Sequence, residues 1–135
     1  MASDPASANT AARPLSPHLQ IWRWTPTMAA SITHRATGVA LYSGTLLLAF
    51  WAFAVSRGEA FYGPVSRFLA SPIGVLILFG YAWALIFHAL NGLRHLYWDT
   101  GRGFDVNTAR LTAIATFAAS LLLAIAIVAA GLSAR

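Results

Sequence analysis

The stretch SPIGVLILFGYAWALIFHALNGLRHLYWD, residues 71–99, decides the fold of this chain. Most of it belongs to a run of 26 residues, Phe68–Leu93, that contains no Asp, Glu, Lys or Arg. An α-helix needs about 20 apolar residues to cross a hydrocarbon core of about 30 Å. The stretch therefore predicts a transmembrane helix, and Ser71 followed by Pro72 is typical of a helix start.

Two other uncharged runs, residues 36–56 and 111–134, are also long enough to span a membrane. Only 10% of the 135 residues are charged, whereas a soluble domain carries about 25%. We therefore expect an all-α integral membrane protein with three transmembrane helices, at about 26–56, 71–98 and 109–132.

The remaining segments are short. We expect residues 1–12 to be a disordered N-terminal tail and residues 13–135 to form a single membrane-anchor domain. The tail lacks the apolar core of a signal peptide and the Arg-rich amphipathic character of a transit peptide. Residues 15–24, LSPHLQIWRW, predict a short interfacial segment, because tryptophans favour the membrane–water boundary. Gly63-Pro64 indicates a loop at residues 57–64.

All nine basic residues are arginines, and the net charge is +5. They lie at the predicted helix ends and form no stripe for nucleic acid, so they fit lipid headgroups and membrane topology better. The absence of cysteine excludes disulfides and cysteine-ligated iron–sulfur clusters in this chain. Six arginines belong to the side that holds the N-terminus, which predicts a cytoplasmic N-terminus and a periplasmic C-terminus. These six are Arg13, Arg23, Arg35, Arg94, Arg102 and Arg110.

Polar side chains of two predicted helices gather at that same side. Ser31, His34 and Arg35 lie in the early turns of the first helix, and His88 and His95 lie near the end of the second. Ionisable groups are costly in lipid and usually line a functional site. This clustering is the main functional signal in the sequence.

A b-type haem accounts for this pattern, since it needs an imidazole on iron, cations for its propionates and small residues beside the ring. His88 lies deepest and suits the iron, whereas His34, Arg35 and His95 suit the propionates. His88 and His95 share one face of one helix with Asn91 and Gly92 between them, so they cannot approach one iron from opposite sides. His34 has the right geometry to oppose His88 but lies close to the interface. We therefore expect a second axial ligand to come from another chain.

Simpler interpretations exist for each residue. A lone transmembrane histidine more often hydrogen-bonds a neighbouring helix than binds metal. Arg94 and His95 fit snorkelling interface residues, Arg35 fits a topology marker, and Gly38 and Gly92 fit close-packing positions.

Three motifs carry a resemblance to a known family. RPLSPHLQIW (13–22), SITHRATG (31–38) and HALNGLRHLYWDTG (88–101) resemble the cytochrome b membrane-anchor subunit of succinate dehydrogenase, respiratory complex II, in order and in spacing. The likeness covers nearly everything from Arg13 to the C-terminus. The short tail resembles bacterial members, which implies the bacterial inner membrane.

The resemblance implies roles residue by residue. His88 matches the axial ligand of haem b, and His34 and Arg35 match positions near the haem propionates. Ser31 and Arg35 match the serine and arginine that line the ubiquinone site. His95 matches the second histidine of its motif, which is not the axial ligand.

The resemblance also implies partners. A flavoprotein with FAD, an iron–sulfur subunit and a second small membrane subunit, which supplies the other haem ligand, would surround this chain together with lipids. The chain itself would carry no catalytic residue. Two alternatives are the anchor of a fumarate reductase and a small cofactor-free transport or proton-relay protein. The second is weakened because the polar groups stop at one face and the third helix, with Ser120 as nearly its only polar side chain, is almost featureless.

Overall fold

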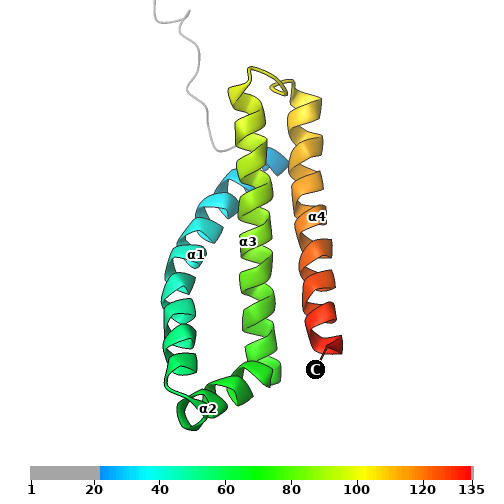
Figure 1. Ribbon diagram of the computed structural model, residues 1–135. Coiled ribbons are helices and arrows are strands. Elements are labelled where there is room, and N and C mark those ends of the chain that lie inside the picture. Colours follow the sequence, from blue (N-terminus) through cyan, green and yellow to red (C-terminus); the bar gives the residue numbers. More distant parts are fainter. Residues whose placement is uncertain (1–21, 135) are drawn as a thin grey trace, which may run out of the picture.

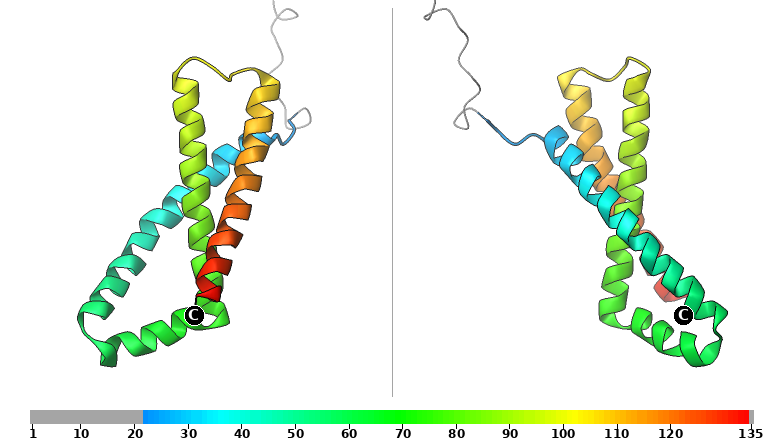
Figure 2. Two further views of the ribbon diagram at one scale, coloured as in Figure 1. Left: turned by 45° about the vertical axis from the view of Figure 1, so that its right-hand side comes forward. Right: turned by 90° about the vertical axis from the view of Figure 1, so that its left-hand side faces the viewer.

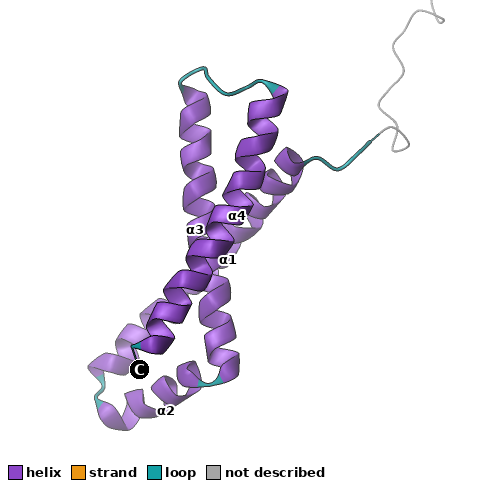
Figure 3. Cartoon of the chain, turned by 90° about the vertical axis from the view of Figure 1, so that its right-hand side faces the viewer, coloured by secondary structure: helices purple, strands orange, loops and turns teal. Residues whose placement is uncertain are grey.

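The computed structural model describes residues 22–134, which form four helices and no strand (Figures 1 and 3). Their bounds are Pro26–Ser56 (α1), Glu59–Ala70 (α2), Pro72–Asp99 (α3) and Val106–Ser133 (α4). By length and composition, α1, α3 and α4 are able to cross a membrane. The predicted all-α class with three membrane-length helices is confirmed. The predicted tail and most of the interfacial segment lie outside the described residues.

Side-chain caps begin the three long helices. The Thr25 hydroxyl accepts a hydrogen bond from the Met28 N–H at 3.3 Å, and the Ser71 hydroxyl accepts one from Gly74 at 3.2 Å. Each cap is followed by proline, as the sequence predicts. α4 is capped by Asp105, whose carboxylate accepts the Thr108 N–H at 2.9 Å, and hydrogen bonding to Thr108 lowers the pKa of that carboxyl.

The predicted loop at residues 57–64 is wrong from Glu59 onward, because α2 begins there and includes Pro64. Gly58, with φ at 81°, directly precedes α2 and turns the chain between α1 and α2. Pro64 removes the hydrogen bond that its N–H would give to Ala60, and its ring crowds the Ala60 carbonyl. Both residues are exposed, so the free Ala60 carbonyl can find another donor. α2 thus connects the far ends of α1 and α3 (Figure 1).

α3 packs against both α1 and α4, and α1 crosses the other two long helices obliquely (Figure 2). At the crossing, Ala30, Phe87 and Ala113 form a small buried core, one residue from each long helix. The start of α1 and the loop between α3 and α4 lie towards the same end of the molecule, called here the α3–α4 loop end (Figure 1). The predicted polar residues therefore share one end of the helices.

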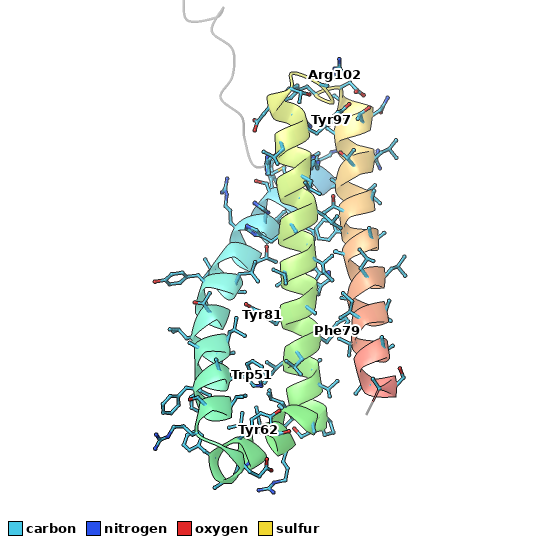
Figure 4. The ribbon with its side chains drawn as sticks, in the orientation of Figure 1. Trp51, Tyr62, Phe79, Tyr81, Tyr97 and Arg102 are labelled. Carbon is cyan, nitrogen blue, oxygen red and sulfur yellow. The ribbon has the colours of Figure 1, made fainter. Side chains whose placement is uncertain are left out.

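Away from this crossing, α1 and α3 are in contact where the ring of Tyr81 packs against Gly44. The Tyr81 side chain lies between the two helices (Figure 4), and Gly44 is buried beneath it. A Cβ atom on Gly44 would overlap the Tyr81 ring. Only glycine therefore fits without a shift of the Tyr81 ring or of one helix.

We expect Gly44→Ala to destabilise the protein by about 1–3 kcal/mol, because overpacking forces the backbone or the ring to move. The measurement is the thermal midpoint of the detergent-solubilised protein. Gly131→Ala is the matched control, since a Cβ there meets nothing within 4 Å. Equal midpoints for the two variants would contradict the close contact.

Candidate functional site

Three histidines from two helices meet near the α3–α4 loop end. The His34 ring of α1 stacks on the His88 ring of α3, with centroids 3.9 Å apart and planes 14° from parallel. The His95 ring lies 5.3 Å from that of His34. The structure therefore brings together all three histidines that the sequence predicts for a site.

The hydrogen bonds of His88 determine which ring nitrogen carries its proton. Nδ1 lies 3.1 Å from the His34 carbonyl oxygen and 3.3 Å from the Thr37 hydroxyl. Thr37 donates its own proton to the carbonyls of Thr33 and His34, so it presents a lone pair to His88. Two acceptors around Nδ1 require that Nδ1 be protonated. Nε2 then keeps its lone pair, the state in which an imidazole binds a metal.

Gly38 allows His88 to approach α1 this closely. A Cβ on Gly38 would lie 3.1 Å from the Cε1 atom of His88, tighter than an ordinary contact. The close-packing interpretation of Gly38 is therefore confirmed, with His88 as the group it admits. A Cβ on Gly92 would meet nothing within 4 Å among the described residues, so α3 is open at Gly92 and the close-packing interpretation of that residue is wrong.

His34 and His88 do not face each other across a space that could hold a haem ring. Their stacked rings leave no space for a macrocycle between them. This arrangement agrees with the expectation that His34 does not oppose His88 as a ligand. The Nδ1 atom of His34 is buried and has no hydrogen-bond partner among residues 22–134.

The two other predicted site residues lie on the same part of α1. Ser31 is half-buried and Arg35 is exposed, four residues apart on one helix face. Arg35 is thus free to reach a ligand or a headgroup, whereas Ser31 lies nearer the helix packing.

Arg94 is the polar residue that the sequence interpretation missed. It was expected to snorkel at the interface, yet it is only 6% exposed. Its guanidinium donates to the Asn91 side chain at 3.4 Å, to the Thr112 hydroxyl at 3.1 Å and to the Ala109 carbonyl at 3.0 Å. It also lies over the Trp98 ring, 4.0 Å from the centroid. The short connection between α3 and α4 places Thr112 and the Ala109 carbonyl within reach of Arg94.

The hydrogen bond from Arg94 to Thr112 corrects the expectation that the last transmembrane helix, α4, is almost featureless. Thr108, Thr112 and Thr116 recur every four residues on one face of α4, the spacing of a helix contact. Thr112 takes the Arg94 hydrogen bond, and Thr116 is buried. This threonine spacing was the signal in the sequence that pointed to a buried polar partner.

Among the described residues, no three His, Cys, Asp or Glu side chains are placed to hold a metal ion together. The histidine cluster alone is therefore not a three-ligand metal centre. A metal on the His88 Nε2 atom would need its other ligands from elsewhere, as the iron of a haem does.

Comparison with known proteins gives one consistent family. Residues 9–127 match the family model described as "Succinate dehydrogenase/Fumarate reductase transmembrane subunit". The chain is 38% identical over 120 residues to the succinate dehydrogenase cytochrome b556 subunit of Paracoccus denitrificans, covering 89% of this chain and 92% of that protein. The corresponding subunit of Rickettsia bellii is 38% identical over 113 residues, covering 84% and 88%.

A mitochondrial relative matches over a shorter region. The cytochrome b560 subunit of succinate dehydrogenase from Sus scrofa is 40% identical over 96 residues, covering 70% of this chain and 57% of that protein. The family model and the bacterial relatives extend over most of the chain, and three of its helices have the length and apolar character of membrane spans. The chain therefore belongs to the family of succinate dehydrogenase/fumarate reductase transmembrane subunits.

Proposed function

We propose that this chain is the cytochrome b membrane anchor of a succinate dehydrogenase, in which it helps bind haem b and ubiquinone and carries electrons from the iron–sulfur subunit to quinone. The names of the relatives support a place in an oxidoreductase complex. A flavoprotein, an iron–sulfur subunit and a second small membrane subunit are the proposed partners. The proposed location is the bacterial inner membrane, with a cytoplasmic N-terminus.

The single observation that carries the haem assignment is the arrangement around His88. Its Nδ1–H is held by the His34 carbonyl and the Thr37 hydroxyl, and its Nε2 has no hydrogen bond among the described residues. An orienting bond on one ring nitrogen is the usual companion of metal binding by the other. A bound haem would supply one-electron redox chemistry at this position.

The surroundings of His88 fit the rest of such a group. The buried Nδ1 atom of His34 lacks a partner among the described residues, which suits a site completed by a ligand. His34, Arg35 and His95 are the proposed neighbours of the propionates, because imidazole and guanidinium groups can donate to carboxylates. The second axial ligand is proposed to come from the other small membrane subunit.

Ser31 and Arg35 are the proposed quinone-binding residues. Reduction of a quinone places negative charge on its carbonyl oxygens before protons arrive, and positioned donors stabilise such charge. The Ser31 hydroxyl offers one donor and the Arg35 guanidinium offers a permanent cation. Arg35 is exposed at the α3–α4 loop end, where protons from the aqueous side are near.

The test is a reduced-minus-oxidised optical spectrum of membranes that carry the chain with its partner subunits. We expect a b-type signal that appears when succinate is the reductant. An assembled, succinate-oxidising complex without that signal would contradict the haem role and leave anchoring and quinone binding.

Neither alternative function is favoured. The cofactor-free transport or proton-relay protein lacks support from the family, whose relatives are named as cytochrome b subunits. The family description includes fumarate reductase, but the relatives named above are succinate dehydrogenase subunits. The measured direction of the reaction would separate the two enzymes.

A further inference from the structure

Three side chains of α3 form a continuous line of hydrogen bonds towards the histidine cluster. Arg94 donates from Nη1 to the Asn91 Oδ1 atom at 3.4 Å, and the Asn91 Nδ2 atom lies 3.3 Å from the His95 Nε2 atom. Asn91 is fully buried and Arg94 is 6% exposed. Thr112 and the Ala109 carbonyl hold the other side of the guanidinium on α4. The chain of hydrogen bonds therefore begins at a guanidinium that α4 holds in place and ends at His95.

The chemistry of the three groups determines the direction of every bond in this line. A guanidinium has only donors, so Asn91 must turn its oxygen towards Arg94. The amide nitrogen of Asn91 then faces His95 and donates to Nε2. A neutral imidazole that accepts at Nε2 carries its proton on Nδ1.

We propose that Arg94 is a positioning residue that, acting through Asn91, holds His95 as the Nδ1–H tautomer. The fixed tautomer gives His95 one donor, at a constant place beside His34. The acceptor that this donor suits is a carboxylate of the bound ligand, and this last point rests on the proposed function, in which the carboxylate is a haem propionate. The cation needed to orient Asn91 also explains why an arginine is buried among uncharged acceptors.

The experiment is solid-state 15N NMR of the complex with its partner subunits, labelled at histidine and kept reduced with dithionite. Ring nitrogens with and without a proton have well-separated resonances, and loss of signals in His95→Gln assigns them. In the native protein we expect a protonated Nδ1 and a bare Nε2 on His95. In Asn91→Asp the new carboxylate can only accept, so we expect Nε2 to become protonated.

Two further variants separate positioning from a general packing role. Thr112→Val removes one acceptor of Arg94 but leaves the line to His95 intact, so the native tautomer should persist. Arg94→Met frees the Asn91 amide to rotate, so signals of both tautomers should appear. If Arg94→Met fails to assemble, Asn91→Asp decides, because it keeps the shape of the side chain.

A bare Nδ1 on native His95, an unchanged Nε2 in Asn91→Asp, or the native tautomer alone in Arg94→Met would overturn the proposal. The same samples give a haem spectrum that is independent of this result. Native tautomers in a complex without haem would refute the haem role and leave the assignment of Arg94 standing.

Discussion

His88→Ala is expected to remove or perturb the b-type haem spectrum of the assembled complex. The substitution deletes the Nε2 atom, which is the proposed iron ligand and stays unprotonated because Nδ1 donates to the His34 carbonyl and the Thr37 hydroxyl. Loss of one axial imidazole changes the ligand field of the iron even where a second ligand remains. The measurement is the reduced-minus-oxidised spectrum, recorded beside the native complex at equal amounts of assembled protein.

Rescue with free imidazole distinguishes a lost ligand from a lost fold. The His88→Ala substitution leaves a space about the size of the deleted ring, so imidazole added with haem should restore the native spectrum in part. A His88→Ala complex with an unchanged spectrum would end the ligand assignment. His88 would then be a packing residue that bonds α1 to α3.

Arg35→Ala is expected to lower quinone reduction by about 100-fold or more, the usual cost of removing one donor to a developing oxyanion. Succinate oxidation with a soluble electron acceptor should survive, because that reaction bypasses the membrane site. The measurement is the ratio of quinone-linked to acceptor-linked turnover in the same preparation. Arg35→Lys should retain part of the activity, since it keeps the charge but loses the planar fork.

Arg102→Ala is the matched control for this experiment. Arg102 is also an exposed arginine and lies at the same α3–α4 loop end (Figure 4). Its removal should leave the ratio of the two activities unchanged. Equal loss of both activities in Arg35→Ala would instead assign Arg35 to holding the assembly together.

The three long helices and the starts of α1 and α3 could be predicted because the signals are local, whereas α4 starts at Val106, three residues before the predicted start. Uncharged runs long enough to cross the hydrocarbon core predict α1, α3 and α4. The caps at Thr25 and Ser71 involve residues only three positions away. α2 could not be predicted with the same rules. Gly63 and Pro64 favour a turn locally, yet both lie inside α2, which contains an exposed proline despite the lost hydrogen bond and the crowding of its ring.

The candidate site was predictable as a set of residues but not as a geometry. Spacing along α3 places His88 and His95 on one face, and membrane depth places them beside the start of α1. The stacking of His34 on His88 depends instead on how closely the helices cross at Gly38. The burial of Arg94 depends on Thr112 in another helix. Both are contacts between helices, which periodicity within one helix does not determine.

The small core at the helix crossing has a consequence for biosynthesis. Ala30, Phe87 and Ala113 join the three long helices near the histidines. Further along, α1 and α3 meet at Gly44 and Tyr81, which also line an open groove of about 480 Å³. All three long helices are therefore joined to one another near the histidines, whereas only α1 and α3 line the groove further along. Because cleavage follows the population of locally opened states, we expect a chain that is made without its partners to be cut first at the groove end.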